Sequence, residues 1–212
     1  MAKQRATTYR PELAVSRRRF IARPSLVTKQ ADWYVDPGAS VEKQSLERVS
    51  LAITNVGLGA AKDVKVHWSF YIADAVARLN DLARSRQSDA VVSIKDGTIS
   101  LNSSDMGKVT SMWKNQSTTT HDYLLPASAH GDAIHLQIPH AFQLIANCFI
   151  ALAFRGDGAH SFPELPTLDL SLSYLDIADS RHYAKFRIHV SLAMIADRGE
   201  SFHAELVPTR AA

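Results

Sequence analysis

Apolar and polar positions alternate along much of this chain. The period of two is clear in residues 49–53 and 64–70, on either side of an Asn-x-Gly-x-Gly corner, and it recurs in 134–138, 168–174 and 186–194. Such alternation is typical of strands with one buried face. The apolar positions expected in the core are Val49, Leu51, Ile53, Val66, Trp68, Leu170, Leu172, Ile188 and Val190. The pattern therefore predicts a mainly β protein.

Other segments break this alternation. Residues 74–84 have apolar residues at helical spacing, which predicts one short helix inserted between strands. Apolar runs on either side of Asp96-Gly97 predict a hairpin over 90–101. The Ser/Thr-rich tract 102–120 is expected to be a long loop. Residues 142–154 are apolar on both faces, so a central strand and a buried helix both remain open.

Length and composition favour one domain. The 212 residues are 46% hydrophobic, enough for a continuous core, and the one cysteine, Cys148, excludes an internal disulfide. The first residues lack an apolar leader, and Gln143 and Asn147 interrupt the longest apolar run. We therefore expect no membrane span and a cytoplasmic location.

Charge is concentrated at the N-terminus. Residues 1–30 carry eight basic residues and one acidic residue, a local charge of +7, whereas the remainder carries −4. We divide the chain into a basic arm, 1–23, and a single β-sandwich domain, 24–212. Clustered cations attract anionic partners, so the arm supplies the candidate partner-binding residues. These are Arg10, Arg17, Arg18, Arg19 and Phe20.

Two motifs resemble a known family. Asn55, Gly57, Gly59 and Ala61, between Ile53 and Val64, resemble the corner of bacterial immunoglobulin-like domains of the cell-adhesion-related (CARDB-like) type. The segment 172–177, with Tyr183 and Phe186, resembles the late hairpin of such domains. The resemblance covers roughly residues 45–72 and 168–195. It implies an immunoglobulin-like antiparallel β-sandwich that acts as a binding or spacer module.

One constellation has the residue types of a metal site. His130 and Asp132, completed by His182 or His189, would give the two imidazoles and one carboxylate of non-haem Fe(II)/2-oxoglutarate-type oxygenases. His130-Gly131-Asp132 is also ordinary turn chemistry before the strand at Ile134, and this interpretation is the one we favour. We therefore expect no metal, no cofactor and no catalytic residue.

The sequence thus favours a non-catalytic protein-interaction or assembly module of a larger bacterial complex, with a protein partner or self-assembly. A nucleic-acid-binding accessory protein acting through Arg17–Arg19 is the first alternative, because arginines next to an aromatic side chain suit a phosphate backbone. The oxygenase is the second.

Overall fold

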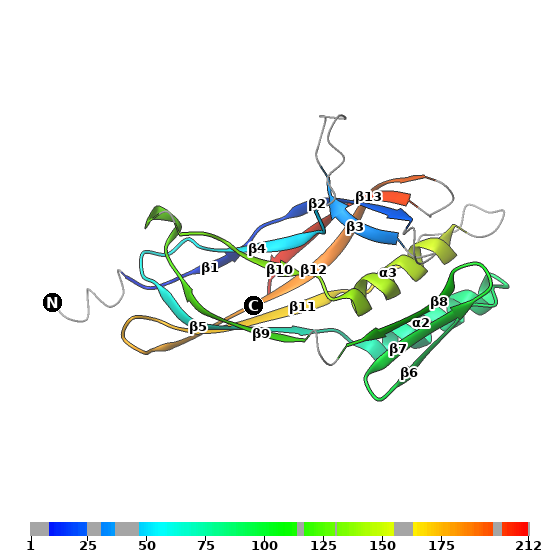
Figure 1. The fold of residues 1–212 in the computed structure, drawn as a ribbon, viewed down its shortest axis with the longest axis horizontal. Coiled ribbons are helices and arrows are strands. Elements are labelled where there is room, and N and C mark those ends of the chain that lie inside the picture. The colour runs from blue at the N-terminus through cyan, green and yellow to red at the C-terminus, as the bar shows by residue number, and fades with distance from the viewer. Residues whose placement is uncertain are drawn as a thin grey trace.

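The computed structural model describes residues 9–24, 31–36, 47–113, 117–129, 131–154, 163–196 and 201–211. The chain is mainly β, as the alternation predicts, and every strand ladder in the described part is antiparallel. Figure 1 shows a large curled sheet, a smaller sheet lying over it, and helices beside a further, outlying sheet.

The large sheet has seven strands in the order β3-β2-β13-β12-β11-β5-β9. Their bounds are Ala31–Val35 (β3), Arg18–Pro24 (β2), Ser201–Arg210 (β13), Arg181–Ala196 (β12), Leu168–Leu175 (β11), Ala61–Ser69 (β5) and Thr118–Leu124 (β9). The inward positions of β5 and β11 are buried, whereas their outward positions are mostly polar. This sheet therefore has one core face and one solvent face.

The small sheet covers part of that core face. It has the order β1-β4-β10, with β1 at Leu13–Val15, β4 at Ser50–Asn55 and β10 at Ile134–Gln137. Its buried residues join those of the large sheet in one hydrophobic cluster. Eight of the nine predicted core residues are at most 2% exposed, and the ninth, Val190, is partly buried against the same cluster.

The ambiguous apolar run is a buried helix. The helix α3 spans His140–Ala153, and ten of its residues are buried. It packs against the end of the large sheet at Trp33, whose ring nitrogen donates to Asn147 Oδ1 at 2.8 Å. The expectation of one helix is therefore wrong. Periodicity did not reveal α3 because a helix that is covered on nearly all sides has no amphipathic pattern.

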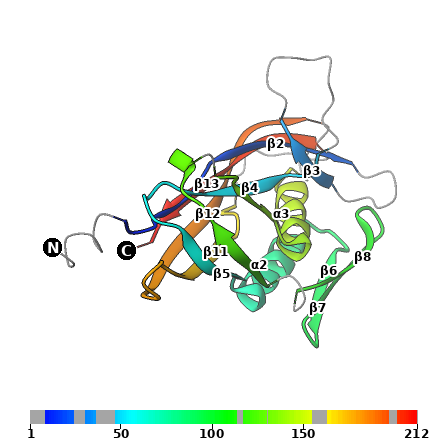
Figure 2. The same cartoon turned by 60° about the vertical axis from the view of Figure 1, so that its left-hand side comes forward.

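The inserted helix and the hairpin are confirmed. The helix α2 spans Ile72–Ser85, and the hairpin joins β6 (Val91–Lys95) to β7 (Thr98–Ser103) through Asp96 and Gly97, which have φ of 51° and 76°. A third strand, β8 (Gly107–Met112), completes this outlying sheet. Figure 2 shows α2 and α3 near one another, with the β6–β8 sheet beside them. A single turn of 3-10 helix, η1, lies at Ala127–Ala129.

The predicted long loop at 102–120 contains strands. The end of β7, all of β8 and the start of β9 fall within it. Serine and threonine suggested a loop because they compete with the backbone for hydrogen bonds. In β8 and β9 the threonines occupy exposed strand positions instead, where threonine favours strands, whereas Ser111 of β8 is buried.

The segment set apart as an arm contributes two strands to the body. β1 pairs with β4, and β2 lies between β13 and β3. The boundary at residue 23 therefore falls inside β2. Phe20 is completely buried and stacks on Trp33 at 4.3 Å between ring centroids. Its neighbour Arg19 points to solvent, whereas Arg18, two residues before Phe20 in β2, is partly covered.

In the described part of the chain, neither helix is long and apolar enough to cross a membrane.

Candidate functional site

Asn55 organises one end of the molecule, at the corner formed by residues 55–61. Its side chain is buried and makes four hydrogen bonds. Its Oδ1 accepts from the backbone N–H groups of Glu12 and Gly57, both at 3.1 Å. Its Nδ2 donates to the carbonyl oxygens of Gly59 at 2.7 Å and Leu124 at 3.1 Å. The Asn55 side chain thus links the N-terminal segment, the corner and the end of β9 through hydrogen bonds.

The corner glycines permit a close approach of two backbones. A Cβ on Gly57 would lie 2.3 Å from the Arg10 carbonyl oxygen, and a Cβ on Gly59 would lie 1.8 Å from that of Tyr9. Only glycine fits at such distances. The Asn-x-Gly-x-Gly motif is therefore explained by the docking of residues 9–12 against the corner.

This docking forms a small polar pocket, which we call the arginine pocket. It has a volume of about 300 Å³ and is lined by Arg10, Pro11, Glu12, Tyr174 and Arg210. Arg210 Nη1 lies 3.0 Å from Glu12 Oε1, so the pocket joins the N-terminal segment to the end of the last strand. Burial raises the pKa of Tyr174, although the positive charges of Arg10 and Arg210 oppose that rise. The phenol is therefore a neutral hydroxyl at physiological pH.

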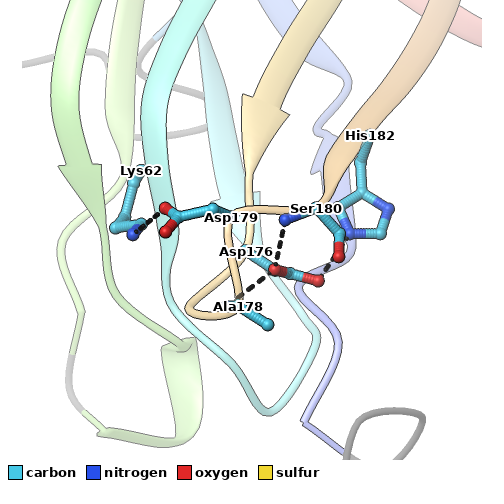
Figure 3. Close-up of polar contacts among 6 residues, drawn as sticks. All are labelled: Lys62, Asp176, Ala178, Asp179, Ser180 and His182. Atoms are coloured by element: carbon cyan, nitrogen blue, oxygen red, sulfur yellow. Dashed lines mark hydrogen bonds and ion pairs between the residues drawn. The ribbon is translucent and has the colours of Figure 1, made fainter.

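The hairpin between β11 and β12 lies at the same end and is held by Asp176 (Figure 3). The Asp176 carboxylate accepts from the backbone N–H groups of Ala178 at 2.8 Å and Ser180 at 2.9 Å, and from His182 Nε2 at 3.0 Å. Burial opposes its ionisation, but these hydrogen bonds outweigh burial and lower the pKa of Asp176. On the outer side of the hairpin, Lys62 Nζ lies 2.6 Å from Asp179 Oδ1.

A second candidate surface is the free side of β9, which we call the free edge and define as Thr118–Tyr123. Within the described ranges, β9 pairs with β5 alone. The Trp68 N–H donates to the Ser117 carbonyl at 2.8 Å. Because hydrogen-bonded and non-hydrogen-bonded pairs alternate in an antiparallel ladder, the backbone groups of Thr118 and Thr120 point away from β5. No described segment pairs with these donors and acceptors.

The structure separates the predicted partner-binding residues. Arg10 lies in the arginine pocket, and Arg17, just before β2, and Arg19, within it, are exposed. Arg18 is partly covered, with 37% of its side chain exposed, and lies 4.0 Å from Glu47. Phe20 belongs to the core and is not available to a partner. The five residues therefore do not form one surface.

The structure does not bring together the residues of the predicted alternative metal site that it describes. His130 lies outside the described residues, and Asp132 is exposed in the loop before β10. His189 points outward from β12 and lines a groove of about 240 Å³ with residues 163–167, which does not include Asp132. His182 is held by Asp176. Among the described residues, no three His, Cys, Asp or Glu side chains gather as metal ligands.

Sequence reasoning missed the residues that complete both surfaces. Alternation predicts that Tyr174 points inward, but no sequence pattern places it beside Glu12 or Arg210. Arg210 and Arg10 are separated by most of the chain. β9 was missed because its exposed threonines resemble a loop.

Comparison with known proteins adds no relative: no family model matches the chain, no curated protein matches its sequence, and no solved structure matches its fold. The resemblance to CARDB-like domains therefore stays a prediction.

Proposed function

We propose that this protein is a non-catalytic interaction or assembly module that binds an extended segment of a partner protein along the free edge. The observation that carries this proposal is the unpaired row of backbone groups on β9. Strand addition to such a row supplies main-chain hydrogen bonds, and the side chains on either face supply specificity.

The composition of the free edge supports this proposal. Sheet edges are commonly protected by lysine, proline, a bulge or a covering segment. Residues 118–123 contain neither lysine nor proline, and Asp122 is their one charged residue. Tyr123 is 66% exposed and offers an apolar contact beside the edge. An incoming strand therefore meets no charge barrier over most of this length.

We also propose that the scaffold is a variant of the immunoglobulin-like sandwich. Two antiparallel sheets that share one core support this interpretation, as does the docked Asn-x-Gly-x-Gly corner. The helix α3, which takes the place of strands over part of the large sheet, is the main departure.

A displayed library of random peptides tests strand addition without a known partner. Selected peptides should lose binding to Thr120→Pro, since proline removes the outward N–H, and should keep binding to Thr120→Val, which retains it. Hydrogen exchange gives a second measurement. The amides of Thr118 and Thr120 should exchange quickly in the free protein and slowly in the complex, whereas Thr119, bonded to β5, should be protected in both.

Binders that tolerate Thr120→Pro would place the interaction elsewhere and contradict the proposal. A purified chain that already protects Thr118 and Thr120 would indicate that the partner is a second copy. Its dimer should then dissociate on introduction of Thr120→Pro.

The outer face of the large sheet favours nucleic-acid binding as a second candidate. In the strand register, Ser173 lies opposite Lys65 on β5 and Tyr183 on β12, while Ser171 lies opposite Lys185. Tyr183 is 65% exposed. Cations around an exposed aromatic ring suit a single strand, because bases stack on the ring while the cations neutralise phosphates.

This second candidate predicts binding that weakens steeply with salt. Replacing Lys65 and Lys185 by glutamine should lower the salt slope of single-stranded DNA binding by up to about two units. If the nucleic acid binds at Arg17 and Arg19 instead, replacing these two arginines should lower the salt slope. Replacing Lys65 and Lys185 should then leave it unchanged. Filter-binding titrations over a range of salt concentrations distinguish the two sites.

A further inference from the structure

The arginine pocket has an uncompensated positive charge. Two guanidinium groups, Arg10 and Arg210, line it together with one carboxylate, Glu12, which leaves a formal charge of +1. Glu12 already pairs with Arg210 at 3.0 Å. Arg10 has no ion pair with any residue in the described ranges. Among the described residues, one arginine of the pocket therefore has an acidic partner and the other has none.

The remaining lining residues supply a hydroxyl group. Tyr174 is 4% exposed, and its ring stacks on His182 with 5.5 Å between centroids, so the side chain is fixed in place. Because its pKa is raised, its hydroxyl keeps a proton to donate. Pro11 and Tyr174 are buried, so the exposed lining consists of the Arg10, Glu12 and Arg210 side chains, and about 300 Å³ exceeds the space that one small ion needs.

The geometry points to a binding site for a small carboxylate, with Arg10 and Arg210 as its charge partners and the Tyr174 hydroxyl as a further donor. Arginine binds carboxylates through parallel N–H donors. A single negative charge neutralises the pocket, whereas a doubly charged phosphate would overcompensate it. This inference does not depend on strand addition at the free edge.

Glu12 acts in this site as an internal competitor. Its carboxylate occupies Arg210 in the absence of ligand, so an incoming carboxylate must displace it or share the arginine. Substitutions at Glu12 and Arg210 should therefore change ligand affinity in opposite directions. A merely structural ion pair does not predict that opposition, because its loss from either side would disturb the same contact.

The test is a nuclear magnetic resonance titration of the full chain with benzoate as the probe. Benzoate should shift the backbone amide signals of residues 10–13, 174 and 210. Arg10→Gln and Arg210→Gln should each weaken binding by roughly tenfold or more, because each removes a charge-assisted hydrogen bond. Glu12→Gln should tighten it severalfold. Arg181→Gln removes an exposed arginine outside the pocket and should leave the affinity unchanged.

Two further probes define the ligand. Inorganic phosphate should bind more weakly than benzoate. N-acetylphenylalanine mimics the C-terminus of a peptide, and its amide should not bind. Whichever of benzoate and N-acetylphenylalanine binds more tightly identifies a free acid or a peptide terminus as the source of the carboxylate, and either result supports the site.

Several results would overturn the inference. These are the absence of benzoate binding, tighter binding of phosphate, weakening by Glu12→Gln, or an equal loss in Arg181→Gln, which would indicate unspecific charge attraction. Amide spectra of each variant show whether it remains folded, and the exposed substitutions Arg10→Gln and Glu12→Gln keep the test informative if Arg210→Gln fails to fold.

Discussion

The two edge strands of the seven-stranded sheet, β3 and β9, differ in whether another segment of the chain pairs with their outer side. At β3, the chain covers its own edge: the Val49 N–H donates to the Trp33 carbonyl at 3.0 Å, and the Val35 N–H donates to the Glu47 carbonyl at 2.9 Å. At β9, no segment in the described part of the chain pairs with the outer side. The same sheet thus has one closed edge and one free edge.

This difference separates stability from binding. The closed edge includes Trp33, which is buried among Phe20, Phe142 and Phe202. The free edge belongs to β9, a strand whose one buried residue, Leu124, lies beyond this edge. A substitution at the closed edge should therefore act on folding, whereas a substitution at the free edge should act on partners.

The largest expected effect is at Trp33. Trp33→Ala should lower the free energy of unfolding by about 3–5 kcal/mol, because it leaves a cavity in the core and removes the donor to Asn147 Oδ1. Tyr123→Ala at the free edge should change it by less than about 0.5 kcal/mol. Urea denaturation of both variants makes the comparison. Equal losses would show that the free edge is also part of the stable core.

Asn55 comes next, because it ends the free edge by bonding the Leu124 carbonyl. Asn55→Ala should cost about 2–3 kcal/mol in the free energy of unfolding, since it leaves buried carbonyl and N–H groups without partners. Asn55→Asp keeps the acceptor for Glu12 and Gly57 but loses both donated bonds, so it should destabilise as well. A neutral result for either variant would contradict the fastening role. Asn102→Ala, at an exposed position, is the control for urea denaturation.

How far these edges follow from the sequence depends on burial. Strands with one buried face, such as β5 and β11, follow from their alternation, and the hairpin at Asp96-Gly97 follows from its turn residues. β9 has almost no buried side to mark it, and α3 has almost no exposed side, so periodicity fails at both extremes. Pairings such as Glu12 with Arg210 require the fold itself, since no local pattern relates the two termini.

A third edge, on β6, is closed by a side chain. Asn80 of α2 donates to the Val92 carbonyl and accepts from the Val92 N–H, both at 2.9 Å, and so imitates a neighbouring strand. Asn80→Ala should cost about 1–2 kcal/mol in the free energy of unfolding and leave the outer backbone groups of Val92 without this partner. Hydrogen exchange should then show faster exchange at Val92, with Thr120 unchanged. Unaltered exchange at Val92 would mean that Asn80 does not protect this edge.

The smallest effect concerns pH at the closed edge. Burial lowers the pKa of His140, and the positive charge of Arg48 adds to this while Asp32 opposes it. In the unfolded chain His140 therefore takes up a proton near pH 6.5, whereas in the folded chain it does so only at a lower pH. The contribution of His140 to the free energy of unfolding should be constant above pH 6.5. It should fall as the pH drops from 6.5 to the lower pKa that His140 has in the folded chain. His140→Gln should flatten that part of a denaturation series between pH 5 and 7, leaving the free edge unaffected. A slope that persists in the variant would assign the pH dependence to other groups.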